Sequence, residues 1–486
     1  MGAASTMVTL TPSTAHTTLG PAFYDEVVPA HFPELTLRYR NQRAAATVGL
    51  DTLTEAQWIE HFGRFVPIPG SLTTPLALRY HGHQFQAYNA DLGDGRGFLF
   101  AQLQDDAGRL LDLGTKGSGR TPWSRMGDGR LTLKGGVREV LATAMLEALG
   151  VDTSKSLSLV ETGEELERSD EPSPTRASVL VRLSHGHVRI GTFQRLGFLG
   201  DTGNLGRLLD YALATYLPGV APPGDNARAE KFLAAVAERV AATGADWLAA
   251  GFVHGVLNSD NINITGESFD YGPWRFLPHY DPNFTAAYFD QTGLYAFGRQ
   301  PDALAWNLTR LAEVLLPLGS HDGLEAALNR FWPAFQQAMW SAALRRLALL
   351  PRGAAEDAEL VVRIFGFLHS SGIRYEQFWF DWRGGTLSAG RAARSPAADA
   401  YAGDAFAPVR AALAPYVATG TANLDHPYFA RAVPRTMLID EVEALWAPIA
   451  ERDDWSALHR VLGEIEEMRQ AYAGDAKSSA RPAASS

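Results

Sequence analysis

Apolar residues recur at every third or fourth position through much of the second half of the chain. The pattern is clearest in "ARAEKFLAAVAERVAATGADWLAAGF", "DALAWNLTRLAEVLLPL" and "GLEAALNRFWPAFQQAMWSAALRRLALL". This spacing places apolar side chains on one face of an α-helix. We therefore predict that residues 203–350 are mainly helical and that residues 425–472 are helical again.

The region before these helices has a different pattern, in which glycines separate short apolar runs. Phe98–Leu103 and Leu110–Lys116 are typical of two strands joined by the turn "DDAGR". The segment "GVREVLATAMLEALG" then has helical spacing, and Glu139 lies off its apolar stripe. Residues 75–200 are thus predicted to form a small sheet with one helix.

Together these patterns predict an α+β fold. A chain of 486 residues is too long for one compact core, so more than one lobe is expected. We expect a tail and extension in residues 1–74, a sheet-rich N-lobe in 75–202, a larger helical C-lobe in 203–472, and a disordered tail in 473–486.

Composition and charge narrow the class of protein. Apolar residues make up 46% of the chain and the net charge is −11, so we expect a globular protein without a nucleic-acid partner. No apolar run reaches the ~18 residues of a membrane-spanning helix. The chain has no cysteine, which excludes disulfides and thiolate chemistry. We expect a cytoplasmic monomer without a membrane partner.

Two glycine-rich segments are candidates for anion binding. In "LGDGRG", Gly93 and Gly95 would let backbone N–H groups approach a phosphate, with Arg96 beside them. The alternative is a tight turn, and the motif by itself favours that interpretation. The second segment, "KGSGRTPWSRMGDGR", contains Asp128 and Gly129.

Lys116 and Glu139 form a second pattern between and after these loops. In the predicted strand, Lys116 shares a face with Asp112 and Gly114. Glu139 on the following helix is either a solvated side chain or a partner that orients the lysine. A glycine-rich loop, a strand lysine and a helix glutamate, in this order, are typical of the front half of a protein-kinase-like nucleotide site.

The segment "VLVRLSHGHVRIGTF" suggests a pair of arginines. A hairpin turning at His185-Gly186 would place Arg182 opposite Arg189, on the same face of the sheet. Two opposed cations repel each other, and an anion held between them would remove the conflict. A solvated edge with the register shifted by one residue is the alternative.

The stretch "FVHGVLNSDNINITGESFDYG" carries the remaining candidate chemistry. Kinase-like enzymes of small molecules have H-G-D-x-x-x-x-N followed by D-[FY]-G, in which the first aspartate is the base and the later two residues hold a metal. Here Val256 occupies the base position, whereas Asn261 and Asp270 match the metal ligands. A carboxylate stands instead at Asp260. Carboxylates in an apolar setting are costly unless they are paired or bind a cation.

These motifs, together with "GHQFQ" and "YDPNF", resemble the selenoprotein O family, strongly over residues 75–310 and more weakly to about 390. The resemblance implies a protein-kinase-like bilobal fold that binds ATP in a flipped orientation. It implies transfer of AMP to Ser, Thr or Tyr of protein substrates, with release of pyrophosphate. Residues 425–464 follow the family pattern poorly, and Gln86 and His81 also depart from it.

The resemblance also implies roles for matching positions. Asp260 would be the general base, Lys116 would contact phosphate and Glu139 would orient it. Asn261 and Asp270 would hold Mg²⁺, with Mn²⁺ as the alternative metal, and Asp270 would also face the nucleotide. The other residues expected to line the nucleotide are Gly93, Gly95, Arg96, Asp128, Gly129, Arg182 and Arg189.

Three other functions are weighed against this one. A pseudokinase scaffold that binds nucleotide without chemistry would not require Asp260, Asn261 and Asp270 together. Transfer of the γ-phosphate is disfavoured by Val256. A transition-metal site at His81, His83, His185 and His187 is less favoured than ordinary loop and turn histidines.

Overall fold

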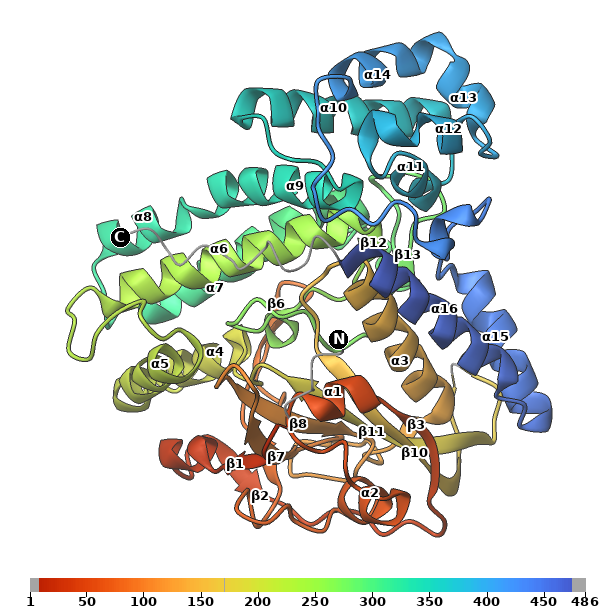
Figure 1. Ribbon diagram of the computed structural model, residues 1–486. Coiled ribbons are helices and arrows are strands. Elements are labelled where there is room, and N and C mark those ends of the chain that lie inside the picture. Colours follow the sequence, from red (N-terminus) through yellow and green to blue (C-terminus); the bar gives the residue numbers. More distant parts are fainter. Residues whose placement is uncertain (1–7, 170, 474–486) are drawn as a thin grey trace.

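The computed structural model describes residues 8–169 and 171–473 and shows a mixed α/β chain with an antiparallel sheet and many helices. Within these residues nine strands form one sheet in the order β2-β4-β7-β8-β11-β10-β3, with β1 beside β7 and β9 beside β11 (Figure 1). The strands of this sheet are β1 (Thr11–Ser13), β2 (Tyr24–Glu26), β3 (Thr36–Arg40), β4 (Leu76–Leu78), β7 (Leu99–Gln104), β8 (Leu110–Lys116), β9 (Leu131–Thr132), β10 (Lys155–Leu166) and β11 (Thr175–Ser184).

The two strands that the sequence placed at Phe98–Leu103 and Leu110–Lys116 are found within a residue as β7 and β8. The first 74 residues were expected to be a tail and an extension, but β1, β2 and β3 come from this segment and pair within the sheet. Their short length gives little period-two signal, which is why the pattern did not reveal them.

Both faces of the sheet are buried, and the alternation of side chains explains which residues meet which layer. Leu111 and Leu113 of β8 pack in one apolar cluster with α1 (Gln42–Ala46) and α2 (Glu55–Phe62). The opposite face turns toward α3 (Leu133–Ala148). Since Lys116 is on this second face, it points toward α3, as the period-two pattern predicts.

Helices make up most of the chain after β11 (Figure 1). The first of these helices, α4 (Ile190–Phe198), begins earlier than the helical region predicted from residue 203. That region holds α5 (Thr202–Tyr216), α6 (Arg228–Ala249), α7 (Gln300–Leu315), α8 (His321–Leu328) and α9 (Phe331–Leu347). They are followed by α10 (Ala354–Ser371), α11 (Tyr375–Asp381), α12 (Ala389–Ala392), α13 (Ala398–Ala402), α14 (Ala407–Leu413), α15 (Ile439–Arg452) and α16 (Ser456–Tyr472). The tail predicted to be disordered, residues 473–486, lies outside the described residues except for its first residue.

The quoted stretch between α6 and α7 is mostly irregular. It contains β12 (Phe252–Val253), which pairs with β13 (Arg275–Phe276), and the single 3₁₀ turn η2 (Ser259–Asn261). The short pair β5 (Gly82–Gln84) and β6 (Ala87–Asn89) forms a hairpin that packs against η2. This segment is therefore fixed by contacts with distant parts of the chain rather than by its own secondary structure.

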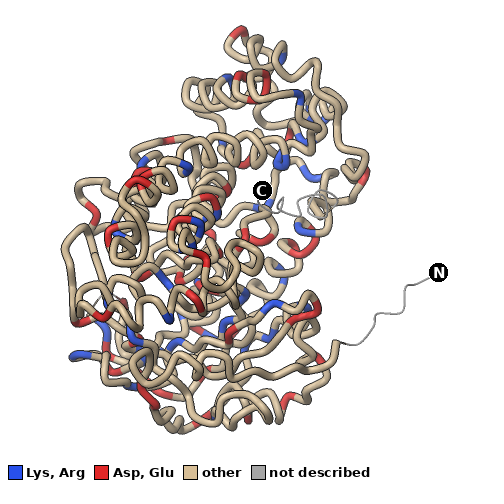
Figure 2. Tube along the Cα trace, turned by 90° about the vertical axis from the view of Figure 1, so that its left-hand side faces the viewer, with Lys and Arg blue, Asp and Glu red and all other residues tan. Residues whose placement is uncertain are grey.

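Charge is spread over the molecule. In Figure 2 acidic and basic residues are both scattered along the chain, and neither kind is confined to one part of the trace. Such a distribution fits the net charge of −11. Among the helices that the structure describes, none has the length and apolar character needed to cross a membrane.

Candidate active site

A buried cluster of opposite charges forms where β8, α3 and the loop after η2 meet. The Nζ atom of Lys116 lies 2.7 Å from Oδ1 of Asp270 and also forms an ion pair with Glu139. Lys116 and Glu139 are both buried. The predicted pairing of Lys116 with Glu139 is confirmed, and the two carboxylates hold the ammonium group in one place.

Asp270 is held ionised by its neighbours. Burial raises its pKa, but Lys116 and Arg182 outweigh this and hold the pKa well below its ordinary value. Nη1 of Arg182 lies 3.1 Å from the same Oδ1 atom. The backbone of Asp270 has φ = 63°, a conformation that costs a non-glycine residue about 1 kcal/mol or more. The two ion pairs help to hold this conformation.

Asp260, only ten positions earlier, has the opposite environment. It lies on η2 and is 9% exposed, and its Oδ1 atom is buried with no hydrogen-bond partner among the described residues. Burial raises the pKa of Asp260 to about 6, and the nearby Arg189 offsets only part of this effect. A carboxyl group with such a pKa exchanges a proton near neutral pH.

Arg182 and Arg189 converge, but not through the predicted hairpin, which is wrong. β11 ends at Ser184, and Arg189 immediately precedes α4. The strand-like residues Val188 and Arg189 pair with the segment 262–264 instead, since Ile264 N–H donates to the Val188 carbonyl over 3.1 Å. The sequence could not show this partner because it lies far along the chain.

Both arginine side chains nevertheless lie over the same ring. Cζ of Arg182 is 5.8 Å and Cζ of Arg189 is 5.1 Å from the centre of the Phe269 ring. Arg189 also lies 4.0 Å from the ring of Tyr80 and donates from Nη1 to the Asp260 carbonyl over 3.2 Å. The guanidinium groups therefore flank Asp270 on one side and Asp260 on the other.

The first glycine-rich segment packs closely against the second. A Cβ atom at Gly93 would clash with the Trp123 ring, and one at Gly95 would lie 2.9 Å from the Trp123 carbonyl oxygen. Close packing thus accounts for these glycines. Arg96 is exposed, and its charge contributes to the low pKa of Asp270.

Asp128 and Gly129 lie in the second glycine-rich segment and make local contacts. Oδ2 of Asp128 is 2.9 Å from Nη2 of Arg168. Gly129 has φ = 72° and its carbonyl accepts a hydrogen bond from Gly119. Asp128 therefore forms an ion pair with Arg168 and does not join the charge cluster around Lys116.

The oxygen ligands expected for a divalent cation are present in part. Nδ2 of Asn261 donates to the Val256 carbonyl over 3.1 Å, which fixes the amide and leaves Oδ1 as an acceptor. An amide oxygen and the Asp270 carboxylate are hard ligands of the kind Mg²⁺ takes, with water and substrate phosphate completing its shell. Over residues 8–169 and 171–473 no group of three or more His, Asp or Glu side chains is arranged around a common metal position.

The histidines considered for a transition metal have ordinary partners. Ring nitrogens of His81, His83 and His187 lie within hydrogen-bond distance of Tyr88 (2.7 Å), Gln194 (2.8 Å) and Asp112 (3.2 Å), respectively. Burial lowers the pKa of His185 to about 4. These contacts fit structural histidines.

Two residues that contact the arginines were not singled out from the sequence. Tyr80 precedes β5, and Phe269 directly precedes Asp270. The position next to Asp270 is the one signal that could have drawn attention to Phe269. The contact between Tyr80 and Arg189 joins distant segments, so local pattern carries no trace of it.

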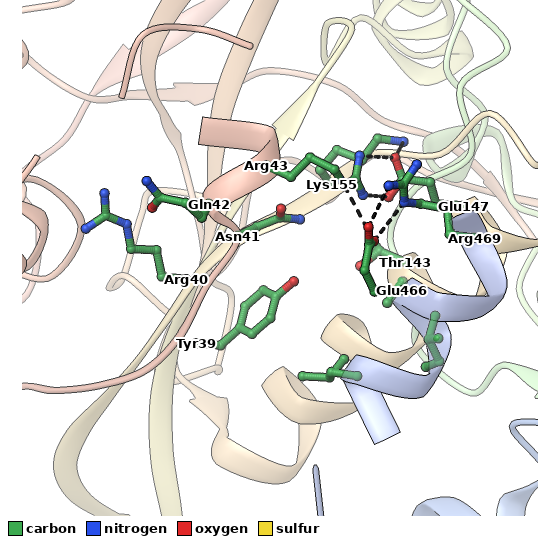
Figure 3. Close-up of a pocket in the computed structure, with 13 residues that line it drawn as sticks. Tyr39, Arg40, Asn41, Gln42, Arg43, Thr143, Glu147, Lys155, Glu466 and Arg469 are labelled. Carbon is green, nitrogen blue, oxygen red and sulfur yellow. Dashed lines mark hydrogen bonds and ion pairs between the residues drawn. The ribbon is translucent and has the colours of Figure 1, made fainter. Parts of the chain in front are cut away.

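A separate cavity of about 310 Å³ lies between β3, α1, α3 and α16 (Figure 3). Its polar side consists of ion pairs, in which Glu147 bonds to Arg43 and lies 3.3 Å from Lys155, while Glu466 lies 2.6 Å from Arg469. None of the predicted site residues lines this cavity. Its charged groups already have partners.

Comparison with known proteins finds relatives along nearly the whole chain. A family profile described as "Protein adenylyltransferase SelO" matches residues 6–466. The chain is 40% identical over 473 residues to "Protein nucleotidyltransferase YdiU" of Trichormus variabilis, covering 95% of this chain and 96% of that protein. Proteins of the same name from Synechococcus elongatus and Synechocystis sp. are 48% identical over 385 residues and 49% identical over 361 residues. These two matches cover 78% and 74% of this chain, and 77% and 75% of the respective relatives.

These relatives define the class of the protein, which is that of the nucleotidyltransferases. The chain belongs to the SelO family of protein adenylyltransferases, which confirms the resemblance drawn from the motifs. The match also includes residues 425–464, where the motifs alone supported no likeness.

Proposed function

We propose that the chain transfers AMP from ATP to hydroxyl groups of Ser, Thr or Tyr in protein substrates and releases pyrophosphate. The observation that carries this proposal is the pair of carboxylates with opposite environments. Asp270 is held charged beside Lys116 and Arg182, whereas the pKa of Asp260 is raised to about 6. When the pKa values of two carboxyl groups are shifted in opposite directions, one group can bind cations and the other can accept and release a proton.

The fold proposed for this activity is a protein-kinase-like bilobal one. The sheet with α3, including residues 75–202, would be the N-lobe, and the helices of residues 203–472 would be the C-lobe. Residues 1–74 would be an extension that supplies edge strands to the N-lobe. The ion pair between a strand lysine and a helix glutamate supports this proposal, since kinases use the same pair to orient a lysine at phosphate oxygens.

In the proposed reaction, Asp260 accepts the proton of the attacking hydroxyl as its oxygen forms a bond to the α-phosphorus. The bond between the α-phosphorus and the bridging oxygen breaks, and the electron pair leaves with pyrophosphate. Lys116 binds phosphate oxygens and Glu139 orients it. A bound Mg²⁺ or Mn²⁺, held by Asn261 and Asp270, would neutralise charge that develops on the phosphates.

Arg182 and Arg189 are proposed to hold the terminal phosphates of ATP. Both are buried and lie over Phe269, so an anion between them would receive charge-assisted hydrogen bonds. Gly93, Gly95 and Arg96 would lie along the nucleotide. Asp128 and Gly129 would also border it, although Asp128 already pairs with Arg168. We further propose a monomer that acts in the cytoplasm.

Separate labelling of ATP on the α- and γ-phosphorus tests the proposal. We expect α-label to appear on protein, pyrophosphate to be released and γ-label to remain in solution. Arg182→Ala should weaken ATP binding more than AMP binding, and Arg207→Ala, at a surface arginine that bonds a backbone carbonyl, should change neither. Transfer of γ-label would show an ordinary kinase. Binding of ATP with no transfer of either label would show a pseudokinase.

A further inference from the structure

The hairpin β5–β6 places a strained aromatic residue directly against the segment that carries Asp260. Phe85 and Gln86 form its two-residue turn, with φ values of 48° and 63°. Such turns favour Asn and Gly, and a bulky residue in this conformation is rare. Strain of this kind is concentrated at functional sites.

Hydrogen bonds tie this turn to the residues before Asp260. The backbone N–H of Phe85 donates to Oδ1 of Asn258 over 3.0 Å, and that of His83 donates to Oγ of Ser259 over 2.9 Å. The Tyr295 hydroxyl donates to the same oxygen of Asn258 over 2.7 Å. The position of the Phe85 ring is thus coupled to the backbone that positions Asp260.

Phe85 belongs to an exposed aromatic surface, defined here as the aromatic platform of Phe85, Tyr288 and Phe289. These residues are 39%, 85% and 47% exposed. The ring of Phe85 lies 5.7 Å from that of Phe289, which lies 5.2 Å from that of Tyr288. Buried Tyr295 supports it from below, 5.0 Å from Phe85. Three neighbouring exposed rings are unusual on a surface without a partner.

The platform offers mainly apolar contact and no stacked cation. Across the residues that the structure describes, no Lys or Arg side chain stacks on any of its three rings, whereas Arg189 and Arg182 stack on Phe269 in the interior. An acidic side chain docked on the platform would lose water without a stacked cation to pair with, and Asp290, which directly follows Phe289, adds a negative charge nearby. The platform therefore favours an apolar occupant over an acidic one.

We propose that the aromatic platform binds an apolar side chain of the protein substrate, one that lies close in sequence to the hydroxyl that receives AMP. This inference rests on the proposed function, because it needs the acceptor to sit at Asp260. Since the hairpin and Asp260 are joined through Asn258 and Ser259, an apolar residue seated on Phe85 would position the neighbouring hydroxyl. The platform would select substrates rather than perform chemistry.

The test uses peptides with one central serine, in which Phe, Ala or Asp occupies each flanking position in turn. Transfer of α-label gives kcat/KM for each peptide. We expect Phe to be preferred over Ala by ~10-fold at one or two positions, and Asp to be disfavoured there. The same peptides with Ala in place of Ser, carrying a fluorophore, report binding by anisotropy without any chemistry.

The variant Phe85→Asn distinguishes the contribution of the Phe85 ring from that of the backbone conformation. Asparagine accepts the left-handed conformation and keeps the N–H bond to Asn258, but it removes the ring. We expect this variant and Phe289→Ala to lose the preference for Phe in both transfer and anisotropy, with unchanged affinity for ATP in calorimetry. Trp332→Ala is the matched control, since Trp332 of α9 is 44% exposed and lies outside the platform.

The outcomes separate this inference from the proposed function. If Phe85→Asn keeps the preference for Phe peptides, the platform does not bind substrate and the inference is overturned. A wild-type dimer that Phe289→Ala converts to a monomer in light scattering would also overturn it, because a second copy would then be the occupant. Anisotropy could instead show that the protein prefers Phe peptides and that Phe85→Asn loses this preference, while no peptide receives label. That result would support binding of an apolar side chain by the platform and would contradict the proposed transfer of AMP.

Discussion

Asp260 and Asp270 are the same residue type in one stretch of the chain, and the fold gives them opposite properties. Asp270 has two cationic partners, whereas Asp260 has a buried oxygen without a partner among the described residues. The pKa of Asp270 is held well below its ordinary value and that of Asp260 is raised to about 6.

The difference shows that the role of a carboxylate is set by segments far away in the sequence. Lys116 comes from β8 and Arg182 from β11, and both reach Asp270. Asp260 is buried, which raises its pKa, and the positive charge of Arg189 offsets only part of this increase. A motif can therefore identify both residues as acidic, and the tertiary contacts decide which one stays charged when the pH falls below 6.

The largest effect is expected from Asp270→Asn. This change removes the charge that holds Lys116 and Arg182 and replaces a proposed carboxylate metal ligand with a neutral amide, so transfer should fall by ~10³-fold or more. The measurement is transfer of α-label across a titration of Mg²⁺. Asp210→Asn, at a surface aspartate paired with Arg228, is the control and should retain activity. Near-normal transfer by Asp270→Asn would refute the assignment.

Asp260→Asn should lower the transfer rate by ~10²–10⁴-fold, because it keeps the shape of the side chain and removes the proton acceptor. Affinity for ATP should be almost unchanged, since Asp260 is proposed to face the acceptor hydroxyl. Calorimetry and labelled transfer measured on the same preparation test both parts. If ATP binding disappears together with transfer, Asp260 binds nucleotide or metal instead.

The pH dependence of transfer should follow Asp260 rather than Asp270. A base with a pKa of about 6 is mostly ionised at pH 7 and mostly protonated at pH 5, so the rate should fall by ~10-fold between these values. Asp270 stays ionised over this range because its pKa is well below its ordinary value. Residual transfer by Asp260→Asn should be flat from pH 7 to 5, and a remaining tenfold slope would point to another group.

The smallest effect concerns stability, where the two variants should differ in sign. The pKa of Asp260 is about 6 in the folded state and 3.8 in the unfolded chain. The protonated form of Asp260 therefore favours folding below pH 3.8, and this stabilisation is lost as the pH rises through about 6. At pH 7.5 Asp260→Asn should therefore raise the free energy of unfolding by ~1–3 kcal/mol.

Asp270 has a depressed pKa, so its stabilising effect is present at neutral pH and is lost only as pH falls through the folded-state pKa. Asp270→Asn should lower the free energy of unfolding by ~1–3 kcal/mol at pH 7.5. Urea unfolding of both variants measures the difference. A change of the same sign in both would contradict the opposite environments of the two carboxylates.

Part of this site could be predicted because its signals are local. The alternation of side chains along the strand Leu110–Lys116 predicts the face of the sheet on which Lys116 lies. The helical spacing of apolar residues predicts that Glu139 lies on the following helix. Their ion pair required only that this helix cover the sheet.

The remaining features depend on partners that no local pattern reveals. Polar and apolar side chains alternate around Val188 and Arg189, as they do in a strand. Only the fold shows that these two residues pair with residues 262–264 rather than with β11. Likewise β1, β2 and β3 are too short to stand out, and the sheet gives them their conformation.

The packing of α16 against α3 has a consequence for biosynthesis. The helix that carries Glu139 leaves the ribosome early, whereas α16 (Ser456–Tyr472) is the last helix of the described chain. Arg38 of β3 and Arg176 of β11 likewise bond to Asp453, which follows α15. A nascent chain must therefore leave the side of α3 that α16 covers exposed while several hundred residues are added, and chaperones have access to that side during this interval.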